Sequence, residues 1–116
     1  MLKIFCGTSS YMAPEIVRKL EYNGFKADVW ALGVVLYVML TGRFPFVGKT
    51  EKELFARIKA GQFLPPVQMN FDAKRLIQRM LSVEPAKRPT ALEIMRDPWL
   101  AGAGTSSSRV PANNLC

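Results

Sequence analysis

Residues 7–15 read Gly-Thr-Ser-Ser-Tyr-Met-Ala-Pro-Glu and carry the most informative pattern in the chain. Pro14 suits the first turn of a helix, because the N–H that proline lacks would have no partner there. Glu15 falls near the positive end of the same helix, where a carboxylate is favoured. We therefore expect a short helix from Pro14 to about Leu20. On composition alone, the preceding Gly-Thr-Ser-Ser is only a polar loop.

A long apolar helix is expected after a turn-like break at residues 21–24, from about Asp28 to Thr41. Residues 29–40 are apolar on almost every side, and such a helix usually lies in the centre of a fold. The β-branched residues would also suit a buried strand, but the length favours a helix. Asp28 would cap this helix, and Gly42 would end it.

Capping residues and apolar spacing predict three further helices. Residues 50–53, Thr-Glu-Lys-Glu, predict a capping box at the start of one helix. Residues 90–93, Thr-Ala-Leu-Glu, predict a second capping box, and the helix it opens would stop at Pro98. Between them, residues 70–81 place four apolar side chains at near-helical spacing: Phe71, Leu76, Ile77 and Met80.

The predicted fold class is therefore mainly α, with no convincing strand. Residues 1–100 would form the helical domain. After Leu100 the chain turns to Ala, Gly and Ser, which cannot bury enough apolar surface to offset the entropy lost on ordering. Residues 101–116 are expected to be a flexible tail.

Composition narrows the class of protein. A chain of 116 residues with 49% hydrophobic residues is long enough for one compact core and too short for two. Its two cysteines, Cys6 and Cys116, lie at opposite ends and suggest no disulfide framework, as in a reducing compartment. The longest uncharged apolar run, residues 29–40, is too short to span a bilayer. We expect a soluble, intracellular protein, cytoplasmic or nuclear, with no membrane partner.

The net charge of +7 raises the question of a nucleic-acid partner. Basic residues are spread along the chain, adjacent only in short pairs and often close to acids. No aromatic residues are interleaved with them as a base-stacking surface would require. We expect solvated helix faces and no nucleic-acid binding.

Five motifs, taken in order, resemble the C-terminal lobe of eukaryotic serine/threonine protein kinases. The resemblance covers about residues 4–100, from the end of the activation segment onward, and is closest to the calcium/calmodulin-dependent and AMP-activated group. Gly-Thr-x-x-Tyr before Met-Ala-Pro-Glu is similar to the serine/threonine class rather than the tyrosine class. The motifs are residues 7–15, Asp28-Val29-Trp30-Ala31-Leu32-Gly33-Val34, Gly42-Arg43-Phe44-Pro45-Phe46, Leu76-Ile77 with Met80-Leu81, and Lys87-Arg88-Pro89-Thr90.

The resemblance implies roles for particular residues. Glu15 and Arg88 would form a buried ion pair that fixes the peptide-positioning loop to the helical core; without the resemblance, two unrelated surface charges would be the simpler interpretation. Asp28 would hold the backbone of the catalytic loop in addition to capping its helix, and Gly33 would permit close packing. The Thr8 hydroxyl would lie near the catalytic aspartate. The substrate-positioning segment would comprise Gly7, Thr8, Ser9, Ser10 and Tyr11.

The parts that perform phosphoryl transfer are missing from the sequence. There is no glycine-rich loop followed by Val-Ala-x-Lys, no histidine and hence no His-Arg-Asp, and no Asp-Phe-Gly. We expect a fragment with no N-terminal lobe or catalytic loop and no cofactor or metal of its own, inactive alone. Its parent would use ATP and Mg²⁺ to phosphorylate protein or peptide substrates. The alternative is a non-catalytic, pseudokinase-like module that binds proteins.

Two positions depart from the family pattern. Ile4 stands where an activating, phosphorylatable threonine is common, so no phosphate switch is expected at that position. Val38 stands where some basophilic kinases carry a glutamate that binds substrate arginine. An arginine preference through that contact is therefore not expected.

Overall fold

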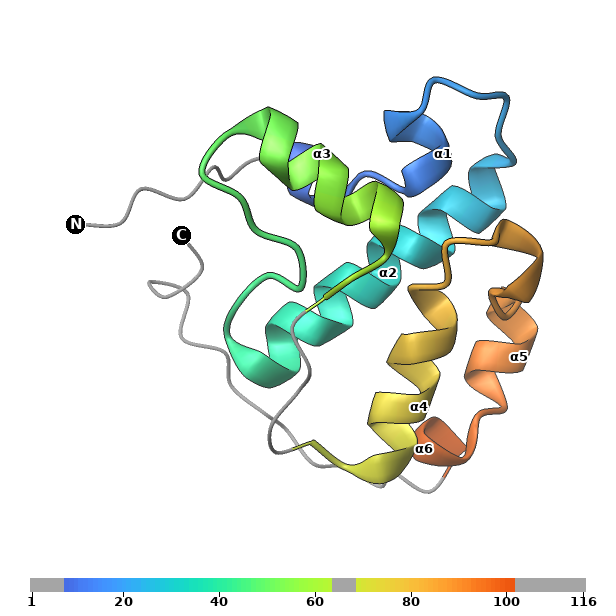
Figure 1. The fold of residues 1–116 in the computed structure, drawn as a ribbon. Coiled ribbons are helices and arrows are strands. Elements are labelled where there is room, and N and C mark those ends of the chain that lie inside the picture. Colours follow the sequence, from blue (N-terminus) through green and yellow to red (C-terminus); the bar gives the residue numbers. More distant parts are fainter. Residues whose placement is uncertain (1–7, 64–68, 102–116) are drawn as a thin grey trace.

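The computed structural model describes residues 8–63 and 69–101, and in these ranges the chain is helical without a β-strand, as predicted (Figure 1). Gly7, both cysteines, Ile4 and residues 102–116 of the expected tail lie outside the described residues. Ala101, which we assigned to the tail, belongs to the last helix. In chain order the elements are η1 (Thr8–Tyr11), α1 (Pro14–Val17), α2 (Gly24–Thr41), α3 (Glu51–Ala60), α4 (Phe71–Met80), η2 (Pro85–Lys87), α5 (Ala91–Met95) and α6 (Pro98–Ala101).

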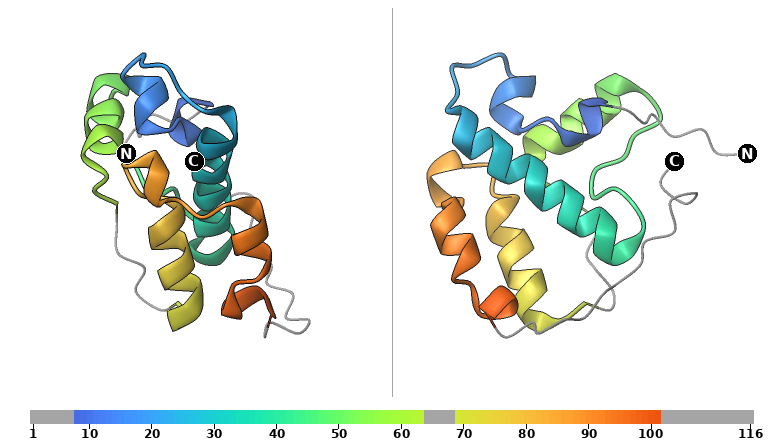
Figure 2. Two further views of the ribbon diagram at one scale, coloured as in Figure 1. Left: turned by 90° about the vertical axis from the view of Figure 1, so that its right-hand side faces the viewer. Right: turned by 180° about the vertical axis from the view of Figure 1, so that it is seen from behind.

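Helix α2 crosses the molecule, with α1 and α3 on one side of it and α4 and α5 on the other (Figures 1 and 2). It begins earlier than predicted, because the Asn23 side chain caps it by accepting hydrogen bonds from the N–H groups of Phe25, at 2.8 Å, and Lys26, at 3.3 Å. Asp28 therefore lies inside the helix, and its predicted capping role is wrong. Gly42 ends the helix as expected, in the left-handed conformation at φ +79°.

The length of α2 corrects one expectation about membranes. The helix has 18 residues and, by length and composition alone, could cross a bilayer. A central helix of a soluble protein meets the same criterion, and Trp30, Val34 and Tyr37 are fully buried within the helical body. Length and composition are therefore weak grounds for a membrane span.

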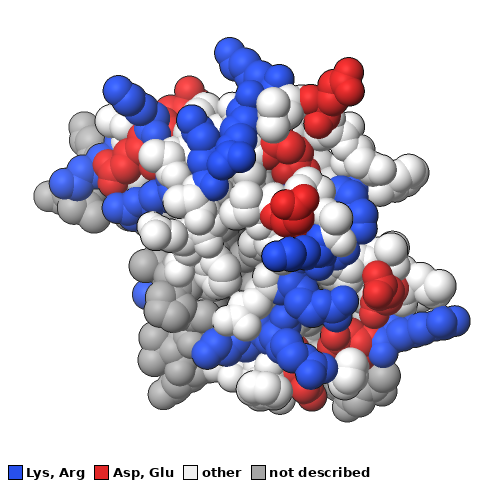
Figure 3. All heavy atoms as spheres, turned by 45° about the vertical axis from the view of Figure 1, so that its right-hand side comes forward, with Lys and Arg blue, Asp and Glu red and all other residues white. Residues whose placement is uncertain are grey.

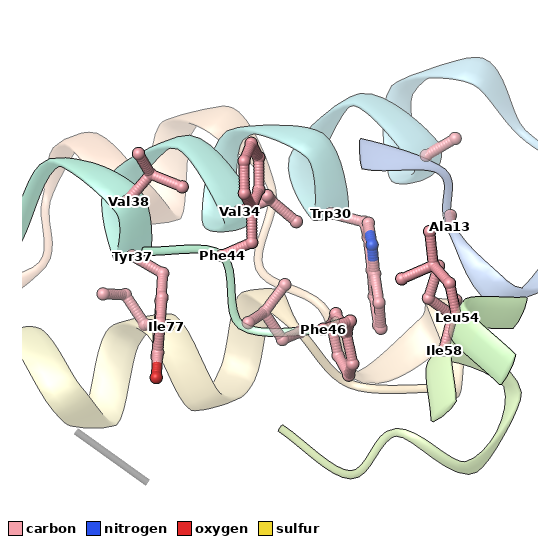
Figure 4. Packing of buried hydrophobic residues seen from close by; sticks show 12 residues of the cluster. Ala13, Trp30, Val34, Tyr37, Val38, Phe44, Phe46, Leu54, Ile58 and Ile77 are labelled. Carbon is pink, nitrogen blue, oxygen red and sulfur yellow. The ribbon is translucent and has the colours of Figure 1, made fainter. Parts of the chain in front are cut away.

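The main core is built on Trp30 of α2. Its ring stacks on Phe46, with the ring centroids 5.3 Å apart and the planes 12° apart, and Figure 4 shows both rings between α2 and the neighbouring helices. Leu54 and Ile58 of α3 are fully buried in the same cluster. A smaller cluster joins α2 to α4 and α5 through Val29, Leu76, Met80 and Ile94.

The caps of the shorter helices differ in part from the prediction. The Thr90 box is complete: Thr90 N–H donates to Glu93 Oε1 at 2.8 Å, and Glu93 N–H donates to Thr90 Oγ1 at 3.1 Å. The hydrogen bond from the Thr90 N–H to the Glu93 carboxylate, and after it the Thr90 hydroxyl beside the same carboxylate, lower the pKa of Glu93. At Thr50 only half a box forms, because Glu53 accepts from the N–H of Lys49 instead.

Three helix details were predicted wrongly. Helix α1 ends at Val17, before Leu20. Phe71 is 74% exposed and so takes no part in the buried face of α4. Pro98 opens α6 instead of stopping α5, because its fixed φ suits a first turn, and Asp97 accepts a hydrogen bond from Trp99 N–H there at 2.9 Å.

Gly33 packs tightly against the C-terminal end of α4. A Cβ atom added at Gly33 would lie 2.9 Å from Cβ of Met80 and 3.1 Å from Cδ2 of Leu81. Atoms in such packed cores do not normally come this close. The prediction that Gly33 permits close packing is confirmed.

We predict that Gly33→Ala lowers the free energy of unfolding by about 1–3 kcal/mol, because the added methyl forces the two helices apart. Urea unfolding followed by circular dichroism measures this change. Gly24→Ala, in the first turn of the same helix, is the matched control, since nothing lies within 4 Å of the added Cβ. The control should be neutral or stabilising by up to about 1 kcal/mol. Equal effects of the two substitutions would contradict this interpretation.

Candidate functional site

The Glu15 and Arg88 side chains, 73 residues apart, meet in a buried, two-pronged ion pair. Arg88 Nη1 donates to Glu15 Oε2 and Nη2 donates to Oε1, each at 2.7 Å. Glu15 is 6% exposed and Arg88 2%. Both terminal nitrogens of the planar guanidinium donate in parallel to the two carboxylate oxygens. Such two-pronged pairs are among the stronger hydrogen-bonded pairs in proteins.

The remaining donors of Arg88 bind backbone carbonyls. Nε donates to the carbonyl of Ser82 at 2.8 Å, and Nη1 also donates to that of Lys26 at 2.9 Å. In return, Lys26 Nζ donates to the carbonyl of Arg88 at 3.0 Å. The guanidinium carbon lies 5.1 Å from the ring centroid of Trp30, a cation–π geometry. Arg88 thus links α1, α2 and the segment that follows α4.

Two opposing influences act on the ionisation of Glu15. Burial by itself raises the pKa of its carboxyl, but the hydrogen bonds and positive charge of Arg88 outweigh burial and hold the pKa below its ordinary value of 4.5. The ionised pair is therefore the stable form at neutral pH.

Segment η1, which leads into α1, holds the residues we expected to position a substrate. Ser10 is buried, and the Tyr11 ring meets Phe44 edge to face with centroids 5.4 Å apart. The Ser9 hydroxyl donates a hydrogen bond to Glu51 Oε2 of α3 at 3.2 Å. Thr8 has its backbone in η1. The structure therefore brings Ser9, Ser10 and Tyr11 together with α3 and the loop after α2.

Asp28 is exposed on α2 and lines a hollow together with Tyr11 of η1. It lines two hollows, one of about 620 Å³ and one of about 330 Å³. Within residues 8–63 and 69–101, its carboxylate has no hydrogen-bond or ion-pair partner. A free carboxylate between two hollows is available to bind a group that these residues do not supply.

The larger hollow, which we call the α2–α5 groove, is almost wholly apolar. The sequence did not show where this groove would lie, because residues 29–40 are apolar on almost every side and carry no sign of which face is covered. Two side chains at its rim are strongly exposed, Phe25 by 83% and Met95 by 71%. The exposed apolar surface continues along α2. Its members there are Leu32, Val35 and Met39, and the groove itself is lined mainly by Phe25, Val29, Leu32, Leu92, Ile94 and Met95.

The distribution of charged side chains differs from that of the exposed apolar side chains. On the face shown in Figure 3, basic side chains cover several elements, with acidic side chains among them. Within the described residues, no group of three or more His, Cys, Asp or Glu side chains could hold a metal ion.

Comparison with known proteins shows to which family the chain is similar. The family described as "Protein kinase domain" matches residues 1–100. The chain belongs to the protein kinase family. It is 48% identical over 100 residues to the probable serine/threonine-protein kinase MARK-A of Dictyostelium discoideum, covering 86% of this chain and 9% of the relative. It is 46% identical over 99 residues to CBL-interacting protein kinase 16 of Oryza sativa subsp. japonica, covering 85% and 22%.

A third relative is the serine/threonine-protein kinase SIK3 homolog of Danio rerio, which is 43% identical over 100 residues, 86% of this chain and 8% of the relative. These matches confirm the predicted resemblance to eukaryotic serine/threonine kinases of the calcium/calmodulin-dependent and AMP-activated group. The chain spans less than a quarter of the length of each of these relatives.

We predict that Glu15→Ala and Arg88→Ala each lower the free energy of unfolding by about 3–5 kcal/mol, because each leaves a buried charge without its partner. The double substitution should cost clearly less than the sum. The exposed pair Glu53–Arg57, with N and O 3.0 Å apart, is the control and should contribute less than about 1 kcal/mol. Additive losses at Glu15 and Arg88 would show that the two side chains do not stabilise the fold as a pair.

The lowered pKa of Glu15 predicts a dependence on pH. A carboxyl whose pKa is lower in the folded state stabilises the fold above its ordinary value of about 4.5, and this stabilisation is lost as the pH falls through the folded-state value. The stability difference between the native chain and Glu15→Gln should therefore shrink as the pH is lowered from 6 to 2. Urea unfolding at a series of pH values measures it, and a difference independent of pH would contradict the shift.

Proposed function

We propose that this chain forms the C-terminal, substrate-binding part of a serine/threonine protein kinase domain, and that catalysis belongs to the whole kinase that contains it. That kinase would transfer the γ-phosphoryl group of ATP to serine or threonine hydroxyls of proteins. The observation that carries the proposal is the α2–α5 groove with the unpaired Asp28 at its edge.

The apolar surface around the groove is of the kind that another segment covers. Exposed apolar surface that is continuous over several residues commonly marks a place where another segment or partner packs. Val35 and Met39 extend it along α2 beyond the groove. We infer that further helical and loop segments of the kinase domain pack here, and that burial of these side chains stabilises their attachment.

Asp28 supports the same inference through its polarity. A carboxylate beside an apolar surface can accept backbone N–H groups of the segment that covers it. The resemblance to kinases gives this role to Asp28, with the catalytic loop as the segment held. Among the described residues, no group forms a hydrogen bond or an ion pair with the Asp28 carboxylate.

The chemistry itself would come from the covering segments. Two observations support this inference: no cluster of metal-ligating side chains is found within the described residues, and the walls of the α2–α5 groove are apolar except at Lys26, Asp28 and Thr90. The catalytic base, the metal ligands and the phosphate-binding lysine are also missing from the 116-residue sequence. This part of the kinase would instead present η1 to the peptide, with the Thr8 hydroxyl near the acceptor.

The test compares the 116-residue chain with the full-length kinase that contains it. Isothermal titration with ATP and Mg²⁺ should detect no binding to the chain, whereas the full-length protein should bind ATP and phosphorylate a serine- or threonine-containing peptide. In the full-length protein, Asp28→Ala should lower kcat about tenfold or more, because the catalytic loop loses its attachment. In the isolated chain the same change should alter stability by less than about 0.5 kcal/mol. Asp72→Ala, at another helix start, is the control and should leave kcat unchanged.

Mg²⁺-dependent ATP binding by the isolated chain would overturn the proposal. A full-length protein that lacks kinase activity, together with a monomeric, cooperatively unfolding chain, would instead favour a protein-binding module.

A further inference from the structure

The contact between η1 and α3 depends on one side-chain hydrogen bond in the described part of the chain. It runs from the Ser9 hydroxyl to Glu51 Oε2 over 3.2 Å and joins residues 42 positions apart. Ser9 is half-buried and Glu51 is exposed. Because the acceptor is a carboxylate, this hydrogen bond is stronger than one between neutral groups, though water screens it in part.

Helix α3 is itself held firmly in place, so it can serve as a support. Leu54 and Ile58 are fully buried on its inner face. At its other end, Arg18 Nη2 donates to the carbonyl of Lys59 at 3.3 Å. The helix is thus fixed by its core contacts and by α1, and Glu51 presents its carboxylate toward η1 from a fixed position.

Beyond the buried Ser10 side chain and its contacts with α2, η1 is held by few interactions. It is a single 3-10 turn of four residues, a conformation with poorer hydrogen-bond geometry than an α-helix. Tyr11 holds its C-terminal end through the ring contact with Phe44. Ser9, nearer the start of the turn, has the hydrogen bond to Glu51.

We propose that Glu51 is a positioning residue for the substrate: its hydrogen bond with Ser9 holds η1 in the conformation that receives the peptide. The inference rests on the proposed function, since it takes η1 to be the peptide-binding segment. Glu51 acts through Ser9 and touches no reacting atom. Its contribution is to lower the entropy that η1 loses when the peptide binds.

The test uses the full-length kinase and measures kcat and KM separately for peptide and for ATP. Ser9→Ala and Glu51→Ala should each raise the peptide KM about threefold to tenfold, the range expected for one hydrogen bond. The double variant should show no larger rise than either single one. The KM for ATP and kcat should stay unchanged, because the lost interaction concerns peptide binding alone. Glu51→Gln keeps an acceptor oxygen and should stay within about twofold of the native KM.

A pair of substitutions that changes the charge at this contact can distinguish loss of the contact from a general loss of structure. Ser9→Asp sets two carboxylates against each other, so the peptide KM should rise more than in Ser9→Ala, and the excess should diminish at high salt. Combining Ser9→Asp with Glu51→Gln should restore the KM, because the glutamine amide can donate to the new carboxylate. Glu53→Ala is the matched control, since the Glu53 carboxylate binds Arg57 and the N–H of Lys49 and nothing in η1. It should leave the peptide KM at the native value.

Failure of this inference differs from failure of the proposed function. A native protein that phosphorylates no peptide overturns the proposed function. A native protein that is active, with unchanged peptide KM in Ser9→Ala and Glu51→Ala, or with additive effects, overturns the positioning role alone. An equal rise of KM in Glu53→Ala would also overturn it, because any disturbance of α3 would then suffice.

Discussion

The buried charge of Arg88 is the constraint on which the rest of the structure depends. A guanidinium removed from water must have all its donors engaged, or the fold loses more than it gains. Glu15, three backbone carbonyls and the face of Trp30 meet that demand. Because these groups come from α1, α2 and the segment after α4, satisfying one side chain fixes three parts of the chain at once. Segment η1 leads directly into α1, so its position follows from the same pair.

The helices and several of their ends could be predicted from residue patterns, since the relevant forces act over a few residues. Gly42 ends α2 because glycine tolerates a left-handed backbone, and Thr90 with Glu93 closes a capping box. Predictions failed where two local sequence signals for the start or end of a helix compete. Asn23 displaced Asp28 as the cap of α2, and Pro98 opened a helix although prolines also end them. The sequence alone does not show which of two competing signals determines where a helix begins or ends.

The candidate site was predictable only in part, for a different reason. Pairing Glu15 with Arg88 across 73 residues required the resemblance to a family, because neither charge carries a local sign of burial. The bond between Ser9 and Glu51 had no sign at all, as both residues are ordinary in a loop and at a helix start. The position of the α2–α5 groove could not be predicted. Residues 29–40 are apolar all round, so no periodicity distinguishes the face toward α4 from the open face.

The close approach at Gly33 has a mechanical consequence. The Gly33 backbone packs directly against the Met80 and Leu81 side chains, so closely that an added Cβ atom would lie 2.9 Å from Cβ of Met80, and no compressible space remains at the contact. Helices α2 and α4 should therefore move as one body, with sliding between them blocked. A segment that packs into the α2–α5 groove would push on α2 and move α4 with it, so binding in the groove would be transmitted to α4 through the contact at Gly33.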